Sequence, residues 1–314
     1  MKNRYKRALV TGGAGFIGSH IVDRLVESGM ETVVIDDLST GKKENVSSKA
    51  KLIVGSILSR RDLKKAMKGV DVVFHNAAKV SVRNSFQDIY DDTETNVMGT
   101  VNVLNAMAEN KARKIILASS MAVYGKNKLP VPETGMLEPV SPYGVGKLAS
   151  EKYCFLMSAF YRFDAVVLRY FNTYGPKQTL TPYVGVITIF INRLLRGEAP
   201  VIFGDGKQNR DFIHVKDVAE ANILAMMSDC ARAVLNVGTG RGTKVSELAR
   251  LLIDEMGSDL KPEYEKAKPG ELADSVADIR MAKDTIGFIA RYRLRDMIAE
   301  TVGVVANSGR GVKC

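Results

Sequence analysis

The sequence predicts an α/β fold in which a doubly wound parallel sheet is joined to a smaller α+β domain. Short apolar runs alternate with helical segments up to about Asn172, and this alternation is typical of parallel sheets with right-handed crossovers. Most runs are unbroken, as in strands that are buried on both faces. Glycine and polar motifs directly follow several runs, at the strand ends where such sheets bind ligands.

The first half contains the expected sheet and its helices in strict succession. Residues 7–13 form a short apolar run that ends in glycines, and segment 16–29 repeats Ile17, Ile21 and Leu25 at helical spacing until a glycine ends it. The later segments repeat this pattern. Further strands are expected within 31–37, 50–56, 71–78, 113–120 and 163–172, and further helices within 59–69, 96–110 and 141–162.

The pattern changes after Asn172. A long loop, an amphipathic helix within 186–198 and two short strands around a glycine turn over 200–215 are expected next. A helix is expected within 216–229, followed by a strand, a loop and a helix in succession within 233–257. We therefore divide the chain into a first domain of residues 1–172 with about 212–235, and a second, substrate-binding domain of residues 173–211 and 236–314.

Composition limits the function. The chain has 314 residues, a net charge of +10 and three cysteines, none of them in a C-x-x-C pair. We expect free thiols in a reducing cytoplasm and no metal site. No segment approaches the roughly 20 apolar residues of a membrane span, and the start reads as a buried strand, not a signal peptide. The positive charge is dispersed without a nucleic-acid motif, so a solvated basic surface is the favoured interpretation, and the charge also permits an anionic small substrate.

Three glycines mark the junction between the first strand and the first helix. Gly12, Gly15 and Gly18 stand in TGGAGFIG, with Phe16 and Ile17 between them. Glycine at such positions permits a tight turn, close approach of the backbone to a pyrophosphate and close packing of the helix on the strand. The free N–H groups at the start of the helix attract phosphate. These five residues therefore predict a dinucleotide site of the Rossmann type.

Asp36 is the predicted partner of the adenosine ribose. It ends the second strand, 24 residues after Gly12, close to the spacing expected for the acid that binds the ribose hydroxyls. A carboxylate there repels a 2′-phosphate, so NAD is favoured over NADP. Asp37 is a second candidate, and a purely structural aspartate is the alternative. No Walker A motif occurs, because Lys147 in GVGKLAS is followed by leucine.

A serine and a tyrosine–lysine pair follow the fifth strand. Ser120 lies at its carboxyl end, and Tyr143 and Lys147 stand four positions apart on the next expected helix. Alone, such a pair is ordinary on a helix. Together with the glycine turn, Asp36, NVMGT and RYFNTYGP, it resembles the extended short-chain dehydrogenase/reductase family, and within it the NAD-dependent nucleotide-sugar epimerases of the UDP-glucose 4-epimerase type. The resemblance covers about residues 8–288.

The resemblance assigns further residues to the cofactor. Asn96 in NVMGT is similar to the family's structural asparagine near the cofactor. Ser56 and Ile57 would contact the adenine, although the family usually has aspartate in place of Ser56. Ala77 in HNAA would belong to the wall beside the cofactor phosphates, whereas His75 reads mainly as a packed strand histidine.

The implied reaction uses Tyr143 as a base. A free tyrosine has a pKa of about 10, and the Lys147 ammonium with the positive nicotinamide of NAD would favour its phenolate. Tyr143 would take the proton of a sugar hydroxyl held by Ser120, and Lys147 would also hold the nicotinamide ribose. Family dehydratases usually carry Asp-Glu after this serine. Met121 and Ala122 cannot move a proton, so epimerisation is favoured over elimination.

Substrate contacts are implied in the second domain. By resemblance, Asn172 would hydrogen-bond the diphosphate or sugar, and the planar guanidinium of Arg210 would bind the pyrophosphate. Val201 and Phe203 would flank the uracil of a UDP-sugar.

A further set of implied contacts follows in the KPGE turn. Lys268 and Glu271 would bind phosphate and ribose, at positions where the family commonly has arginine and aspartate. Ser275 would bound the space around the C2 substituent of the sugar. Because serine is small, we expect N-acetylhexosamines to be accepted beside plain hexoses.

Several functions compete at this point. The favoured one is interconversion of UDP-glucose and UDP-galactose in carbohydrate metabolism; the alternatives are a nucleotide-sugar reductase or dehydrogenase that uses NAD(H) stoichiometrically and, more remotely, a non-enzymatic NAD-binding protein. The helices that start near Asp92 and Ser141 carry extra apolar residues. By resemblance they would form a homodimer through a four-helix bundle, and packing within one chain is the alternative.

Overall fold

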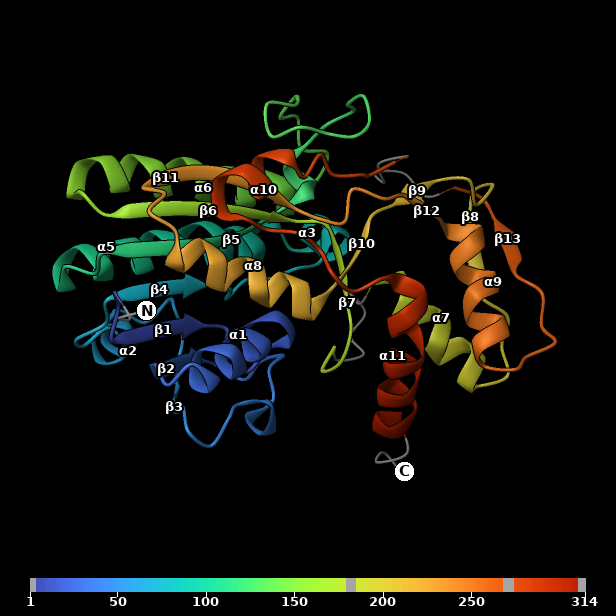
Figure 1. Cartoon of the computed structure of the whole chain (residues 1–314), viewed down its shortest axis with the longest axis horizontal. Helices are drawn as coiled ribbons and strands as arrows, with labels where there is room; N and C mark the ends of the chain where they lie inside the picture. Colours follow the sequence, from blue (N-terminus) through green and yellow to red (C-terminus); the bar gives the residue numbers. More distant parts are fainter. Residues whose placement is uncertain (1–3, 179–184, 268–273, 310–314) are drawn as a thin grey trace.

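In the computed structural model, which describes residues 4–178, 185–267 and 274–309, the first domain is built on a seven-stranded parallel sheet (Figure 1). The strand order is β11-β6-β5-β4-β1-β2-β3. The order reverses between β1 and β4, so the predicted doubly wound sheet is confirmed. The strands are β1 (Arg7–Thr11), β2 (Glu31–Asp36), β3 (Lys51–Val54), β4 (Val72–His75), β5 (Lys114–Ser120), β6 (Asp164–Tyr170) and β11 (Arg232–Val237).

Helices cover both faces of the sheet. One face carries α1 (Phe16–Glu27), α8 (Val215–Met227) and α10 (Arg280–Ile286), and α1 and α8 lie side by side in Figure 1. The other face carries α2 (Arg60–Ala66), α5 (Gly99–Asn110) and α6 (Pro142–Tyr161). Each fully buried aliphatic or aromatic side chain in these two cores contributes roughly 1.5–3 kcal/mol, so burial of both faces stabilises the strand order.

Short helical segments join β4 to α5, and the sequence indicated only a helix start near Asp92 among them. They are α3 (Val82–Gln87), α4 (Ile89–Thr93) and the π-helical turn η2 (Glu94–Met98). The side chains of Ser81 and Asp88 cap the first two. Because such segments are too short to display a helical period, pattern reasoning misses them. Their role is to carry Asp92 and Asn96 to the side of α6.

The second domain packs the helices α7 (Val186–Leu195), α9 (Val245–Glu255) and α11 (Leu294–Gly309) around a separate apolar core. The two short strands expected around a glycine turn over 200–215 are present, but they pair with distant segments that the tertiary fold brings alongside and not with each other. The pairs are β7 (Asn172–Tyr174) with β10 (Phe212–His214), β9 (Asn209–Arg210) with β12 (Thr243–Lys244), and β8 (Val201–Phe203) with β13 (Glu263–Glu265).

One segment lies elsewhere than the sequence-based division places it. Ala282 and Ile286 of α10, and Phe288 after it, are buried in the core that also contains α1 and α8. The division from the sequence places all of 236–314 in the second domain. The sequence of a helix as short as α10 does not indicate which core it packs in. Its place follows from the tertiary fold, in which the chain returns to the sheet.

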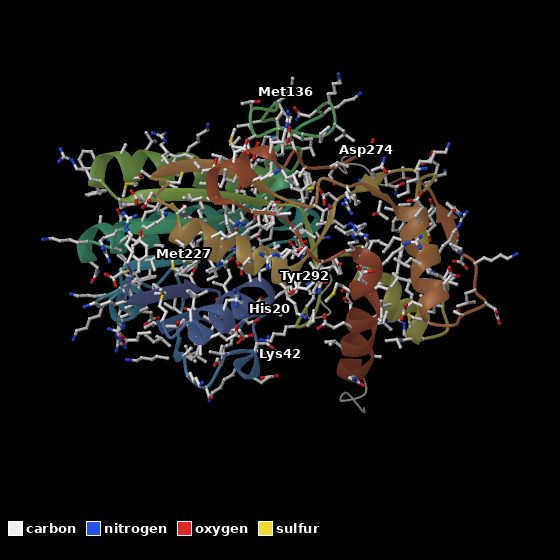
Figure 2. All side chains as sticks on the ribbon, viewed as in Figure 1. His20, Lys42, Met136, Met227, Asp274 and Tyr292 are labelled. Atoms are coloured by element: carbon white, nitrogen blue, oxygen red, sulfur yellow. The ribbon has the colours of Figure 1, made fainter. Side chains whose placement is uncertain are left out.

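The two domains meet beside α1. His20 of α1 hydrogen-bonds the carbonyl oxygen of Pro176 (3.0 Å), and Lys177 pairs with Asp23 of α1 (2.7 Å). Tyr292, which precedes α11, lies in the same region of the molecule (Figure 2). These contacts hold the second domain over the carboxyl edge of the sheet.

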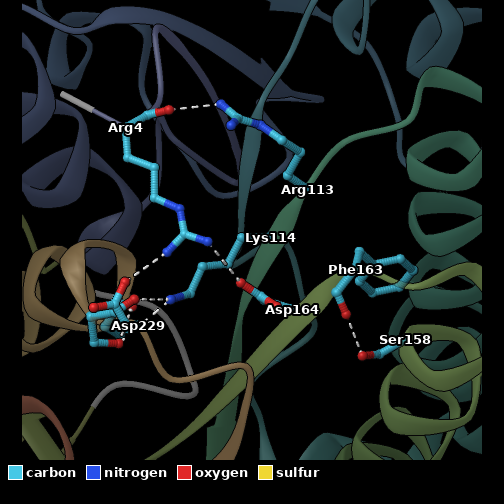
Figure 3. Close-up of polar contacts among 9 residues, drawn as sticks. Arg4, Arg113, Lys114, Ser158, Phe163, Asp164 and Asp229 are labelled. Carbon is cyan, nitrogen blue, oxygen red and sulfur yellow. Dashed lines mark hydrogen bonds and ion pairs between the residues drawn. The ribbon is translucent and has the colours of Figure 1, made fainter.

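Charged groups close the opposite, amino-terminal edge of the sheet (Figure 3). Arg4 pairs with Asp229 (3.0 Å) and with Asp164 (3.8 Å), and Lys114 donates to the carbonyl oxygen of Ser228 (2.7 Å). Burial lowers the pKa of Lys114, and the hydrogen bond satisfies its ammonium inside the fold. This cluster lies at the edge of the sheet away from the ligand-binding strand ends, so we assign it to the fold.

Candidate active site

A cavity of about 780 Å³ runs along the carboxyl edge of the sheet, where the second domain faces the first. The predicted residues that line it are Gly12, Gly15, Phe16, Ile17, Gly18, Asp36, Asp37, Ser56, Ile57, Ala77, Ser120, Tyr143, Lys147 and Asn172. Other predicted residues of the described part of the chain do not line it, namely Asn96, Val201, Phe203, Arg210 and Ser275. Lys268 and Glu271 lie outside the described residues.

The glycine turn is packed so tightly that side chains do not fit. Gly12 has a φ of +68°, and a Cβ atom there would lie 2.7 Å from the backbone nitrogen of Ala77. A Cβ atom on Gly18 would overlap the carbonyl oxygen of Gly12. Glycine is therefore required for the approach of α1 to β1, which leaves the first N–H groups of α1 facing the cavity.

Asp36 is held in place by the backbone at the end of β2. Its two carboxylate oxygens accept hydrogen bonds from the N–H groups of Ala14 and Leu38, both at 2.9 Å. Burial raises the pKa of Asp36 above its usual value, against the opposing effect of these N–H groups. Each oxygen keeps a lone pair that can accept a ribose hydroxyl. Asp37 is exposed and caps a turn by accepting from Ser39 (2.9 Å).

Asn76 is a cavity residue that sequence reasoning missed. Both polar atoms of its side-chain amide are buried and have no hydrogen-bond partner among the described residues. Unsatisfied buried amides are uncommon and indicate an absent partner. Asn76 stands in HNAA, between strand β4 and Ala77 beside the glycine turn, so its position at a strand end was the signal. The glycine turn, Asp36 and this amide together fit a dinucleotide such as NAD.

Ser120, Tyr143 and Lys147 come together in the lining of the cavity. Ser120 ends β5 and its side chain hydrogen-bonds the phenol of Tyr143, which begins α6. The Lys147 ammonium lies 5.9 Å from the centre of the Tyr143 ring and donates to the carbonyl oxygen of Ala118 (3.0 Å). The serine, the phenol and the ammonium are thus presented to one space by two adjoining elements.

The protein alone does not lower the pKa of Tyr143. Burial raises it to about 12, the hydrogen bond from Ser120 lowers it in part, and the charge of Asp92 raises it. Burial also lowers the pKa of Lys147 to about 8, against the charges of Asp92 and Glu151. Ser120, and not Lys147, is the neighbour that lowers the pKa of Tyr143 within the protein. The expectation that Lys147 and the positive nicotinamide of NAD together favour the phenolate stays a prediction.

His75 and Asn96 stabilise the wall behind the site. Thr11 donates to His75 Nδ1 (2.7 Å), and His75 Nε2 donates to Thr100 Oγ1 (3.0 Å), which itself donates to the Asn96 carbonyl oxygen (2.6 Å). Burial lowers the pKa of His75 to about 3, so the ring is neutral. The Asn96 amide hydrogen-bonds both carboxylate oxygens of Asp92 (3.1 and 2.9 Å). Asp92 is a buried acid that sequence reasoning missed.

The predicted substrate residues form a connected group beside the cavity. The Asn172 amide donates to the carbonyl oxygen of Asp211 (3.1 Å) and to the Ser275 hydroxyl (3.2 Å). Arg210 donates to the carbonyl oxygen of Asn209 (3.0 Å) in β9. Asp211 is fully buried and accepts hydrogen bonds from three backbone N–H groups and the Thr239 hydroxyl. Asp211, unnoticed in the sequence, therefore positions the segments on both sides of Asn172.

Two other kinds of site are absent from the described residues. No group of His, Cys, Asp or Glu side chains in residues 4–178, 185–267 and 274–309 has the arrangement of a metal site. Within the same ranges, no helix is long and apolar enough to cross a membrane.

Comparison with known sequences defines the class of protein. The chain belongs to the NAD dependent epimerase/dehydratase family, whose model matches residues 8–238. It is 41% identical over 305 residues to a putative UDP-glucose 4-epimerase of Methanocaldococcus jannaschii, covering 96% of this chain and 99% of that protein. It is also 33% identical to a UDP-N-acetyl-alpha-D-glucosaminuronate decarboxylase of Bacillus cytotoxicus, covering 95% and 97%. The predicted family is confirmed, and its members differ in reaction.

Solved structures agree with this assignment. UDP-glucose 4-epimerase of Thermotoga maritima with UDP-glucose superposes with a TM-score of 0.92 at 37% identity, covering 96% of this chain and 99% of that one. UDP-N-acetylglucosamine 4-epimerase of Methanobrevibacter ruminantium superposes with a TM-score of 0.92 at 38% identity, covering 98% of this chain and 100% of that one. The NAD complex of Thermus thermophilus UDP-glucose 4-epimerase superposes with a TM-score of 0.89 at 34% identity, covering 98% of this chain and 100% of that one. The predicted cofactor, NAD, is thereby confirmed, and the chain is an enzyme of the NAD-dependent UDP-sugar epimerase family.

Proposed function

We propose that the protein is a UDP-hexose 4-epimerase that interconverts UDP-glucose and UDP-galactose. The observation that carries the proposal is the meeting of Ser120, Tyr143 and Lys147 in a cavity that the glycine turn also lines. The relatives named as UDP-glucose 4-epimerases support the same substrate class.

The residues of the chain have distinct roles in this proposal. NAD, when bound, supplies reversible oxidation of the sugar carbon and a positive charge beside Tyr143. Tyr143 takes the proton of the C4 hydroxyl and returns it after the ketosugar has rotated to present its other face. Ser120 holds that hydroxyl and lowers the pKa of the Tyr143 phenol, and Lys147 supports the phenolate and the nicotinamide ribose. Asp36 and Asn76 hold the remainder of the cofactor.

The residues that follow Ser120 favour epimerisation over the other reactions of the family. Elimination of water from an oxidised sugar needs a base for a carbon-bound proton and an acid for the departing hydroxyl, and loss of carbon dioxide leaves an enolate that must be protonated at carbon. Met121 and Ala122 occupy the turn after Ser120 and carry no acid. Epimerisation needs no further acid, because the same proton and the same pair of electrons return to the sugar.

The second domain supplies the nucleotide contacts in our proposal. Arg210 binds the pyrophosphate, Val201 and Phe203 flank the uracil, and Asn172 contacts the diphosphate or sugar. Small Ser275, bonded to Asn172, leaves space for N-acetylhexosamines, and a UDP-N-acetylglucosamine 4-epimerase is among the structural relatives. A reductase that consumes NAD(H) stoichiometrically is the alternative.

We also propose that the chain forms a homodimer through α6 and the α4–α5 segment. Large apolar side chains are exposed there, with Leu156 68%, Phe160 77% and Tyr90 80% accessible. Exposed apolar side chains clustered in this way are typical of protein interfaces. A cytoplasmic location, argued from the unpaired cysteines, also stays a prediction.

Incubation of the purified protein with a panel of UDP-sugars, without added NAD, tests the proposed reaction by NMR of the products. We expect UDP-glucose and UDP-galactose to interconvert without net formation of NADH. The variant Tyr143→Phe should lose nearly all turnover and keep its NAD. Accumulation of NADH would favour the reductase, and an unchanged rate in Tyr143→Phe would exclude Tyr143 as the base.

A further inference from the structure

A buried ion pair lies directly behind the proposed catalytic residues. Arg169 of β6 donates from Nε (2.9 Å) and Nη2 (2.7 Å) to the two carboxylate oxygens of Glu151 on α6. The two side chains are only 3% and 2% exposed. Burying two charges costs desolvation energy that their attraction often does not exceed, so a pair of this kind is weak evidence for added stability. Its geometry therefore requires another explanation.

The pair is connected to the reacting groups through α6. Tyr143, Lys147 and Glu151 stand four residues apart in turn, so all three lie on one face of the helix. The Ser119 hydroxyl donates to Glu151 Oε1 (2.5 Å), and Lys147 donates to the carbonyl oxygen of Ala118. Ser120 is the next residue of β5. The end of β5 is thus bonded to α6 at two consecutive residues immediately before the catalytic serine.

The other side of Arg169 holds the segment that follows Ser120. Arg169 Nη1 donates to the Tyr124 hydroxyl (2.8 Å) and to the carbonyl oxygen of Glu133 (3.1 Å). Tyr124 in turn donates to Asn236 Oδ1 of β11 (2.7 Å). The Ser120 region is therefore restrained both before and after the serine by hydrogen bonds that converge on one guanidinium.

We propose that Ser119, Glu151 and Arg169 form a positioning device that sets the distance and angle between the Ser120 hydroxyl and the Tyr143 phenol. Glu151 and Arg169 do not line the cavity, and of the three residues only Ser119 reaches it, beside Ser120. The device acts by fixing the end of β5 against the face of α6 that carries Tyr143. The inference rests on the proposed roles of Ser120 and Tyr143 in epimerisation.

The variant Ser119→Ala is the sharpest test, because it removes the bond between β5 and Glu151 and leaves the ion pair intact. We expect kcat for the UDP-sugar to fall by about tenfold, since small displacements of positioned groups reduce rates strongly. KM should stay unchanged, because the nucleotide is bound elsewhere. Ser119→Thr keeps the hydroxyl and should restore most of the rate.

A matched control exists on the same helix. Ser158 of α6 is also buried and donates to the carbonyl oxygen of Phe163, at the other end of the helix (Figure 3). Ser158→Ala removes a comparable hydrogen bond and should leave kcat at the wild-type value. Equal losses of kcat in Ser119→Ala and Ser158→Ala would overturn the proposal, because they would indicate a general effect on stability.

A second readout is independent of turnover. Ser120 lowers the pKa of Tyr143 by hydrogen bonding, so displacement of Ser120 should move the titration of Tyr143 to higher pH. This titration is followed by the phenolate absorbance of the NAD-bound protein after the absorbance of Tyr143→Phe is subtracted. Lys147 and Asp92, the charged groups beside Tyr143, are unchanged in all variants. If the wild type fails to convert any UDP-sugar, the proposed function is wrong, and the titration of Tyr143 alone then tests the positioning role. That role would be overturned if the titration of Tyr143 in Ser119→Ala is the same as in the wild type.

Discussion

Single buried residues in this protein take their charge state from their surroundings. Tyr143 and Lys147 stand side by side, yet burial raises the pKa of the phenol to about 12 and lowers that of the ammonium to about 8. His75 is held neutral between two threonine hydroxyls. The sequence identifies these residues as candidates, but desolvation decides which of them carries charge before the cofactor binds.

We predict that His75 makes the fold sensitive to acid. Its pKa is lowered from 6.5 to about 3 in the folded state, so between these values the unfolded chain binds a proton that the folded chain does not. The free energy of unfolding should therefore fall on acidification by up to about 1.4 kcal/mol per pH unit from this residue. His75→Gln keeps a hydrogen-bond donor and an acceptor but does not titrate, so its free energy of unfolding should fall less on acidification.

Urea unfolding of both proteins at about pH 7 and about pH 5 measures this difference. His20 and His214, whose pKa values are also lowered by burial, are present in both proteins and cancel in the comparison. Equal loss of stability in wild type and His75→Gln would contradict the prediction.

Elements bring these residues together through a few close contacts. The turn between β1 and α1 depends on Gly12 and Gly18, and α6 depends on Ser141, whose hydroxyl accepts from the N–H of Gly144 (3.1 Å) and starts the helix just before Tyr143. The start of α6 is thereby fixed at the residue that the chemistry needs. Errors of a single turn in either element would separate the cofactor from the base.

We predict that Gly18→Ala weakens NAD binding. Its new methyl group would overlap the carbonyl oxygen of Gly12, which is backbone and can yield only by moving the turn. Overpacking of this kind typically costs about 1–3 kcal/mol of stability, and the N–H groups of α1 would move away from the phosphates. The amount of NAD retained by the purified variant, together with calorimetric titration, measures the effect.

Gly303 provides the matched control, because it lies in α11 and a Cβ atom there would meet no neighbour. Gly303→Ala should keep wild-type NAD binding and gain roughly 0.5–1 kcal/mol of stability from its better helix propensity. Undiminished NAD affinity in Gly18→Ala would show that the turn tolerates a side chain.

The whole molecule places one large cavity between two unequal domains. The first domain supplies the cofactor site and the reactive groups, and the second supplies the substrate contacts through strands that pair only across long sequence distances. The contacts of α1 with the segment after β7 join the two domains beside the cavity. The exposed apolar side chains of α6 lie on the outside of this assembly.

We predict that Leu156→Glu converts a dimer to a monomer. Leu156 is largely exposed on α6, next to Phe160, and a carboxylate buried in an apolar interface without a partner costs several kcal/mol. Light scattering after size-exclusion chromatography measures the change in mass. Ile289→Glu is the control, since Ile289 is exposed and follows Phe288, which is buried in the core on the sheet face opposite to α6, and it should leave the mass unchanged; a monomeric wild type would refute the proposed interface.

The family resemblance implied the grouping of Ser120, Tyr143 and Lys147, whereas local patterns in the sequence were sufficient for the parallel sheet, the glycine turn and Asp36. Each of these follows from chain order and short-range periodicity, because parallel strands with regular crossovers bring their carboxyl ends to one edge. The tertiary structure alone decided the membership of α10, the pairing of the short strands, the unsatisfied amide of Asn76 and the Ser119–Glu151–Arg169 device. These features depend on contacts between residues distant in sequence and on desolvation, neither of which a local pattern encodes.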